Sequence, residues 1–234
     1  MSTPLEFTGK ERAAHVQKMF TKIARRYDVM NRLMTAGQDI RWRKEVIAHA
    51  KLDTGDALLD LGAGTGDLAR EALRQQPASS ALAADFTLEM MRAGKKHGAL
   101  DWTSADALNL PFPNERFDAI VSGFLMRNVT DVPRALNEQH RTLKPGGRIV
   151  ILDTTRPRKN ILTPFINIHL TYIIPTLGQL LTGERDAYTY LPDSTKGFLS
   201  AEELAATMKE AGFKDVKFSV KMFGTVAIHW GLKE

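Results

Sequence analysis

The sequence predicts an α/β fold with a doubly wound, mostly parallel sheet. From residue 57 onward, short apolar runs alternate with segments whose apolar residues recur every three or four positions. This alternation is typical of parallel strands joined by helices that cover both faces of a sheet. The 234 residues, of which 43% are hydrophobic, are enough for one domain with a substantial core. We therefore predict a single domain over residues 1–234.

The expected elements follow one another without repeats or low-complexity linkers. Ser200 and Glu203 form the pattern of a capping box at the start of a helix, and Gly212 suits its end. Gly146 and Gly147 are expected to turn the chain into a strand. Strands are predicted at 57–61, 80–85, 117–122, 148–153, 215–220 and 224–231, and helices at 10–34, 39–50, 66–76, 87–97, 131–142 and 200–211.

Composition excludes several classes of protein. The chain has no cysteine, which rules out disulfides, thiolate zinc sites and cysteine-held iron–sulfur clusters, and its six histidines show no metal-binding spacing. Its net charge of +5 is scattered, and no stripe of stacking aromatic residues accompanies it, so no nucleic-acid partner is expected. The polar N-terminus lacks the apolar region of a signal peptide, so the expected location is cytoplasmic.

A glycine-rich turn is the most informative local feature. An apolar strand ends in Asp60, and Gly62, Gly64 and Gly66 then alternate before a helical pattern begins. Glycines allow a tight turn with positive φ and a close approach to a ligand, and the free N–H groups of the next helix suit a carboxylate. Asp60 can accept a hydrogen bond from an ammonium group, and Thr65 can add a hydroxyl contact.

The Gly-x-Gly-x-Gly spacing, in place of the Gly-x-Gly-x-x-Gly of dinucleotide enzymes, favours S-adenosylmethionine as the ligand, and two further acidic residues complete the pattern. Asp85 stands at the end of the next strand, where a carboxylate can bind both ribose hydroxyls. Asp106 and the neighbouring Ala107 precede a proline-rich turn, and in class I methyltransferases an acidic or amide side chain here faces the adenine amino group. Asp85 in a simple strand-end turn and Asp106 in a surface loop are the structural alternatives.

The chain resembles the ubiquinone/menaquinone-biosynthesis C-methyltransferase family over nearly its whole length. The family signature Tyr-Asp-x-Met-Asn is present at Tyr27–Asn31, and a second signature stands at Arg141–Gly147. Arg127-Asn128-Val129 is a third element and is much more selective than the common Lys-Pro-Gly-Gly motif. Asp39 replaces the histidine of the signature His-x-x-Trp, and Gly123 stands where a serine on the cofactor side is frequent.

The resemblance implies a Rossmann-like, seven-stranded class I methyltransferase that uses S-adenosylmethionine and no metal. It also implies methyl transfer to a ring carbon of a reduced quinone with an isoprenoid tail, with demethylmenaquinol preferred. In this scheme Arg127 stabilises a phenolate, Asn128 and Tyr27 hold a water network, and Asp153 accepts a proton or a water. The structural alternatives are an ion pair between Arg127 and Asp131, helix packing by Tyr27 and a capping role for Asp153.

Residues 160–183 contain no Asp, Glu, Lys or Arg. Prolines and polar residues within this stretch argue against a membrane span. We expect an apolar helical insert at 158–190, which caps the substrate side of the site together with a helical cap at 1–51. Basic residues from Arg156 to Lys159 are expected to face lipid headgroups at the inner face of the membrane. An ordinary insert or a homodimer surface is the alternative.

Two other functions remain open at this stage. The acceptor could be a ubiquinone precursor or another lipophilic phenol. The chain could also be a non-catalytic S-adenosylmethionine-binding subunit of a membrane-associated assembly, which the presence of Asp85 and Arg127 argues against.

Overall fold

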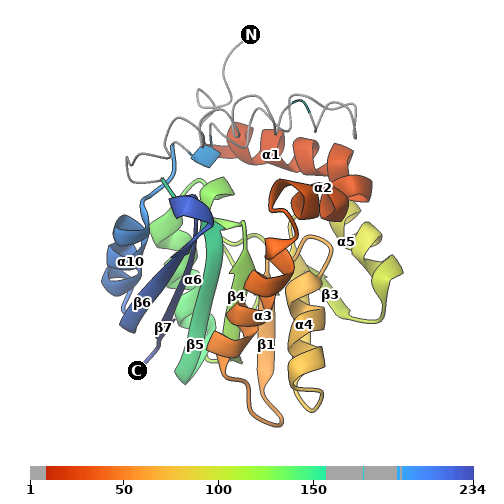
Figure 1. Cartoon of the computed structure of the whole chain (residues 1–234). Coiled ribbons are helices and arrows are strands. Elements are labelled where there is room, and N and C mark those ends of the chain that lie inside the picture. Colours follow the sequence, from red (N-terminus) through yellow and green to blue (C-terminus); the bar gives the residue numbers. More distant parts are fainter. Residues whose placement is uncertain (1–8, 157–175, 177–193, 196) are drawn as a thin grey trace.

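The structure is a computed structural model and describes residues 9–156, 176, 194–195 and 197–234. Its centre is a seven-stranded sheet with the strand order β3-β2-β1-β4-β5-β7-β6 (Figure 1). The first five strands in this order are parallel, whereas β7 runs antiparallel to both β5 and β6. The strands are β1 (Ala57–Leu61), β2 (Ser80–Asp85), β3 (Asp101–Ser104), β4 (Phe117–Gly123), β5 (Leu143–Thr154), β6 (Lys214–Lys221) and β7 (Val226–Leu232).

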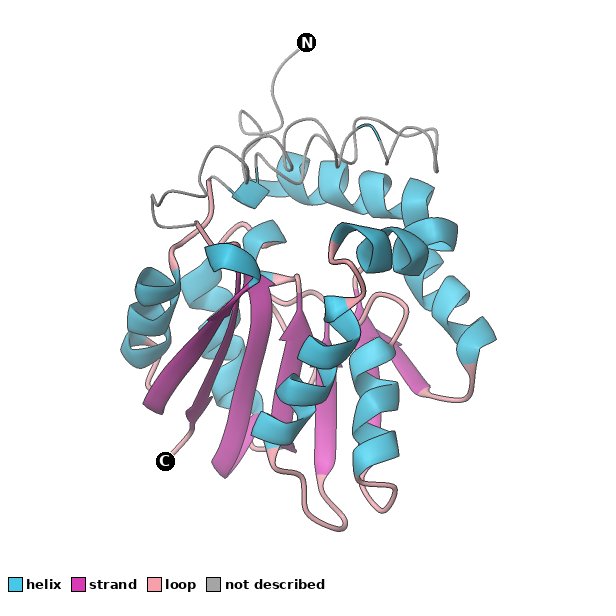
Figure 2. Cartoon of the chain, in the orientation of Figure 1, coloured by secondary structure: helices cyan, strands magenta, loops and turns pink. Residues whose placement is uncertain are grey.

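Helices cover both faces of the sheet, as expected for a doubly wound fold (Figure 2). On one face α3 (Gln38–Ala50) and α4 (Asp67–Gln75) pack against β1, β4 and β5; on the other face lie α6 (Val132–Thr142) and α10 (Ala201–Glu210). All five residues of β1 are buried, which explains why this strand is apolar apart from Asp60 rather than alternating.

The N-terminal helices lie over the carboxyl edge of the parallel strands. There α1 (Gly9–Ile23) and α2 (Tyr27–Met34) form a layer above the strand ends (Figure 1), while α5 (Leu88–Gly94) packs beside α1. Loops that follow parallel strands converge at this edge, so ligand sites of open α/β sheets form there. The next helix, α3, belongs to the layered core through buried residues such as Trp42 and Val46.

Three expectations about individual elements were inexact. The helix predicted at 10–34 is interrupted by a 3-10 turn, η2 (Ala24–Arg26), which turns the chain so that Phe20 and Tyr27 meet edge to face at 5.9 Å. The polar, four-residue β3 at the sheet edge was missing from the strand list because it has no apolar alternation. Gly146 and Gly147 lie inside β5, at a shift in its pairing with β4, rather than before it.

The capping box predicted at the start of α10 is confirmed. Ser200 accepts a hydrogen bond from the Glu203 amide, and the Glu203 side chain accepts one from the Ser200 amide, which completes the capping box. The predicted insert at 158–190 lies outside the described residues. Arg156, expected to face lipid headgroups, forms an ion pair with Glu203 at 2.7 Å.

Candidate active site

The glycine-rich turn connects β1 to α4 at the carboxyl edge. Gly62, Gly64 and Gly66 all have positive φ, between 58° and 84°, so the alternating glycines are required by the backbone itself. Gly66 also needs its lack of a side chain, because a Cβ there would lie 2.8 Å from Leu100 and 2.9 Å from Trp102. The prediction of a tight turn with left-handed residues is therefore confirmed.

Asp60 lies beneath this turn and is 1% exposed. Its Oδ2 atom accepts a hydrogen bond from the Ala69 amide at 3.0 Å, whereas its Oδ1 atom is buried without a partner among the described residues. Burial raises the pKa of Asp60 to about 7, with the Ala69 hydrogen bond opposing the shift. A buried carboxylate oxygen without a partner is costly unless a ligand supplies a donor.

Asp85, at the end of β2, holds the glycine turn in place. Its Oδ2 atom accepts a hydrogen bond from the Gly64 amide at 2.7 Å, and its Oδ1 atom accepts one from the Thr87 amide at 2.7 Å. Burial raises the pKa of Asp85, and these backbone hydrogen bonds lower it. The strand-end turn considered as an alternative is thus present, and the same carboxylate lines the cavity described next.

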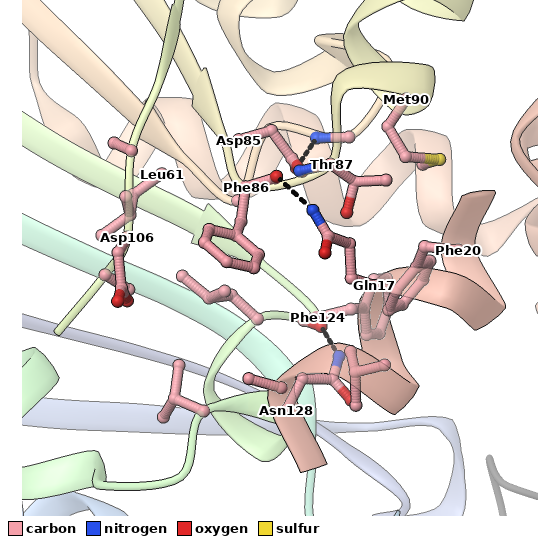
Figure 3. A pocket seen from close by; sticks show the side chains of 18 of the residues that line it. Gln17, Phe20, Leu61, Asp85, Phe86, Thr87, Met90, Asp106, Phe124 and Asn128 are labelled. Atoms are coloured by element: carbon pink, nitrogen blue, oxygen red, sulfur yellow. Dashed lines mark hydrogen bonds between the residues drawn. The ribbon is translucent and has the colours of Figure 1, made fainter. Parts of the chain in front are cut away.

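A cavity of about 150 Å³ lies between the turn and α1. Figure 3 shows Asp85, Asp106 and Phe86 around it, with Gln17 and Phe20 of α1 on the opposite side. Further lining residues include Gly62, Gly64, Ala107, Gly123 and Asn128. Together with Tyr27, the predicted site residues that line this cavity come from five separate chain segments.

Asp106 is exposed, and its Oδ1 atom accepts a hydrogen bond from the Leu108 amide at 2.9 Å. This contact shapes the loop that follows β3 and leaves the carboxylate at the cavity. Ala107 is buried beside it. Gly123 ends β4, where a Cβ would lie 3.3 Å from Leu68, so a larger residue would be crowded at this position.

The helix α1 covers the cavity and contributes residues that the sequence analysis did not assign to the cofactor site. Gln17 donates a hydrogen bond to the Phe86 carbonyl at 3.1 Å, and Thr21 donates one to Glu89 at 3.2 Å (Figure 3 shows the first). Arg12 donates to the Arg127 carbonyl at 2.9 Å. Phe86 directly follows Asp85, and this adjacency was the available sequence signal for its position at the cavity.

Tyr27 begins α2 and lies against the glycine turn, 3.8 Å from where a Cβ of Gly64 would stand. Burial raises the pKa of Tyr27 above its usual value, so its hydroxyl is protonated at neutral pH. Thr65 does not point its hydroxyl freely into the cavity: it donates to Asp28 of α2 at 2.7 Å. Both contacts fix the N-terminal helices to the turn.

Arg127 lies on a 3-10 turn, η4 (Met126–Asn128), directly after β4, and is 6% exposed. Its Nη1 donates to Asp153 at 2.8 Å, and its backbone amide donates to the same carboxylate at 3.2 Å. The suggested pairing with Asp131 is absent, because Asp131 caps α6 by accepting from the Arg134 amide. The Nε atom of Arg127 is buried without a partner among the described residues.

The predicted catalytic residues divide into two groups. Asn128 and Tyr27 line the cavity, and the Asn128 side chain donates to the Phe124 carbonyl at 2.9 Å (Figure 3). Arg127 and Asp153 are not among the residues that line it, and the Arg127 guanidinium carbon lies 5.2 Å from the ring of Phe124, which does line it. Asp153 is 1% exposed, and its Oδ1 atom also accepts from the Thr154 amide at 2.7 Å.

The residues around the turn fit S-adenosylmethionine. Asp60 offers an unpartnered carboxylate oxygen that suits an ammonium group. Asp85 and Asp106 place two further carboxylates at the cavity, where ribose hydroxyls and an amino group of adenine can donate to them. Because Gly64 carries no side chain, a ligand can approach its backbone closely; only Met90 and Tyr27 lie within 4 Å of the position that a Cβ would take.

The chain is similar to known methyltransferases. The model of the ubiE/COQ5 methyltransferase family matches residues 8–233. The ubiquinone/menaquinone biosynthesis C-methyltransferase UbiE of Desulfotalea psychrophila is 47% identical over 93% of this chain and 90% of its own length. A demethylmenaquinone methyltransferase of Roseiflexus castenholzii is 41% identical over 95% of each chain.

A solved structure supports the fold. Human N-acetylserotonin methyltransferase in complex with SAM has a TM-score of 0.60 at 20% identity, with 89% of this chain and 55% of that chain covered. The sheet order and the layers of helices agree with this likeness. The chain belongs to the ubiE/COQ5 methyltransferase family and is an S-adenosylmethionine-dependent methyltransferase.

Proposed function

We propose that this enzyme methylates a ring carbon of a reduced prenylated quinone, with demethylmenaquinol as the preferred acceptor. The similarity to a ubiquinone/menaquinone biosynthesis C-methyltransferase and to a demethylmenaquinone methyltransferase, at 47% and 41% identity over nearly the whole chain, supports this acceptor class. When bound, S-adenosylmethionine supplies an electrophilic methyl group on a sulfonium. The residues proposed to hold it are Asp60, Gly62, Gly64, Thr65, Gly66, Asp85, Asp106, Ala107 and Gly123.

The observation that carries the proposal is the position of η4. This turn places a buried guanidinium, Arg127, and an amide, Asn128, immediately after the strand that lines the cofactor cavity. A hydroquinone carbon becomes nucleophilic when the neighbouring hydroxyl loses its proton, and a phenol with a pKa near 10 requires help to do so at neutral pH. The charge of Arg127 supplies that help by stabilising the phenolate in a site of low dielectric constant.

The contacts support different roles for Arg127, Asp153, Asn128 and Tyr27. Asp153 fixes the guanidinium of Arg127 through Nη1, 5.2 Å from the ring of Phe124, so we expect its charge to act on the phenolate without direct contact. The several hydrogen bonds that Asp153 already accepts do not favour its predicted role as the base. Asn128 and Tyr27 line the cavity and are proposed to orient the phenol or a water molecule beside it.

Two experiments test the acceptor. Purified enzyme is supplied with S-adenosylmethionine and either demethylmenaquinol or a demethylated benzoquinol with the same tail, and methylated products are measured by mass spectrometry. In parallel, quinones are analysed in cells that lack the protein, with and without the wild-type gene. Accumulation of demethylmenaquinone with rescue supports the proposal. Turnover of the benzoquinol alone supports the ubiquinone-pathway alternative, and absence of turnover with either quinol would overturn the proposed acceptor class.

A peripheral contact with the cytoplasmic face of the membrane is part of the proposal. Among the described residues, no helix is long and apolar enough to span a bilayer. The exposed large hydrophobic side chains of these residues nevertheless lie on the elements at the carboxyl edge, near the site: Val29, Leu33, Ile40, Phe86, Leu88, Val220 and Phe223. An apolar surface at the entrance suits a substrate that is dissolved in lipid.

Flotation with anionic liposomes at low salt tests this contact. We expect the enzyme to float with the vesicles, and the double variant V29S/F223S to remain at the bottom of the gradient. A homodimer that buries the same surface is the competing interpretation. Light scattering distinguishes it, because a dimer would dissociate in the variant whereas a monomeric wild type would leave the membrane proposal in place.

A further inference from the structure

Three polar side chains of α1 tie this helix to separate segments around the cavity. Arg12 donates a hydrogen bond to the Arg127 carbonyl of η4 at 2.9 Å, and Gln17 donates one to the Phe86 carbonyl at 3.1 Å. Thr21 donates one to a carboxylate of α5 at 3.2 Å. Since the helix between Arg12 and Thr21 is roughly 13 Å long, α1 reaches from η4 to α5.

The same helix forms one wall of the cavity. Ala13, Val16, Gln17 and Phe20 line it, and Figure 3 shows the last two across the cavity from the glycine-turn side. A cofactor that fills the cavity therefore contacts α1 directly. Arg12 is half-buried and is not among the lining residues, so its contact is with the backbone of η4 rather than with a ligand.

Both backbone groups of Arg127 are held by charged side chains from other elements. Asp153 of β5 accepts a hydrogen bond from the Arg127 amide at 3.2 Å, and Arg12 of α1 donates one to the Arg127 carbonyl. Hydrogen bonds with a charged partner are stronger than those between neutral groups. The turn η4 has only three residues, and its Asn128 amide donates to the Leu125 carbonyl at 2.8 Å. The position of this short turn therefore depends on β5 and α1.

We propose that Arg12 is a positioning residue for methyl transfer, which fixes η4 against α1 and thereby couples cofactor binding to the placement of Arg127. A cofactor in the cavity holds α1, α1 carries Arg12, and Arg12 holds the carbonyl of Arg127. Since Arg12 acts on the reaction through Arg127, this role rests on the proposed function. Gln17 and Thr21 bind segments on the cofactor side of the cavity, so α1 keeps its contact with the cofactor when Arg12 is replaced.

Three variants separate the hydrogen bond of Arg12 from the stability of α1. Arg12→Met is the principal variant, because methionine is unbranched and has a similar helix propensity but no donor. Arg12→Lys keeps a positively charged donor, and a single hydrogen bond to a carbonyl does not require the planar fork of arginine. Lys18→Met is the matched control, since Lys18 is exposed on the same helix and does not line the cavity.

Hydrogen exchange measured by mass spectrometry reads the coupling without an acceptor substrate. In the wild type, saturating S-adenosylmethionine should slow amide exchange about 10-fold or more both in residues 84–90 and in residues 124–130. In Arg12→Met the slowing should persist in residues 84–90, whereas in residues 124–130 it should fall to within about threefold. Lys18→Met should show the wild-type slowing in both segments.

Kinetics with demethylmenaquinol distinguish positioning from a structural role. Arg12→Met should lower kcat about 10-fold with the affinity for S-adenosylmethionine within about threefold of the wild type, and Arg12→Lys should restore most of kcat. An unchanged kcat, or slowing of exchange in residues 124–130 that persists in Arg12→Met, would overturn the proposal.

A parallel loss of kcat, cofactor affinity and Tm in Arg12→Met would also overturn it, because that pattern indicates that Arg12 only stabilises α1. If the wild-type enzyme does not methylate demethylmenaquinol, the proposed acceptor fails. The exchange measurement then still decides whether Arg12 couples the cofactor to η4, because it requires no acceptor.

Discussion

From the contact between α5 and the glycine turn we predict that replacement of Gly94 by alanine destabilises the enzyme, although Gly94 lies at the end of a helix. This residue has helical backbone angles, with φ of −63° and ψ of −36°. In an ordinary exposed helix, replacement of glycine by alanine stabilises by about 1 kcal/mol. Here a Cβ would lie 2.5 Å from the Thr65 carbonyl oxygen and 2.5 Å from the Trp102 ring. The substitution Gly94→Ala is therefore expected to destabilise the enzyme.

The magnitude follows from the overlap. A separation of 2.5 Å is about 0.9 Å shorter than ordinary contact, and one of the two atoms is backbone, which cannot rotate away. Overpacking of this kind typically costs about 1–3 kcal/mol, against a gain of about 1 kcal/mol from helix propensity. The net loss is then about 0–2 kcal/mol, which lowers the Tm by up to roughly 8 °C in a chain of this size.

Thermal unfolding and calorimetric titration of S-adenosylmethionine measure the two consequences of Gly94→Ala. Since Thr65 belongs to the cofactor turn, its displacement should also weaken cofactor binding. Gly55→Ala is the control: Gly55 has φ of 89° but nothing within 4 Å of its Cβ position. That variant should lose stability through backbone strain alone, with normal cofactor affinity. A Gly94→Ala enzyme with a raised Tm and normal affinity would refute the packing argument.

Three further predictions concern the ion pair, the buried carboxylate and a helix cap. Arg127→Ala should lower turnover about 10²–10³-fold with cofactor affinity retained, and should lower the free energy of unfolding by about 3–5 kcal/mol because Asp153 stays buried and unpaired. The double variant R127M/D153N should regain stability without turnover. Full quinol turnover in Arg127→Ala would remove this residue from the mechanism. Because the folded pKa of Asp60, about 7, lies above its unfolded value, its contribution to stability is complete at low pH and falls as the pH rises toward 7. An ammonium ligand favours the ionised carboxylate, so cofactor affinity should rise with pH through about 7 in the wild type but not in Asp60→Asn. Calorimetric titration of the cofactor at several pH values measures this difference. Parallel pH profiles of the two proteins would contradict the assignment of Asp60 to the ammonium group. Ser200→Ala should lower the free energy of urea unfolding by about 1 kcal/mol through loss of the capping box, and a change in cofactor affinity would count against its purely structural role.

Local signals in the sequence were enough for the framework of the fold. The apolar run that becomes β1, the alternating glycines and the Ser200 cap each depend on neighbours within a few residues, so their patterns predict the structure correctly. The short, polar β3 does not have such a pattern, because it is a strand only through pairing with β2. The break between α1 and α2 likewise depends on tertiary contacts, because both helices pack over the glycine turn and its cavity.

By itself, the sequence determined the class of sheet, the glycine turn and the carboxylates Asp60, Asp85 and Asp106. Only the tertiary structure decided which charged side chains lie next to one another. It paired Arg127 with Asp153 rather than Asp131, and it brought Arg43 to Asp60 and the start of α4. The physical reason is that turns and caps are satisfied locally, whereas the partner of a buried charge comes from whichever segment the fold places opposite it.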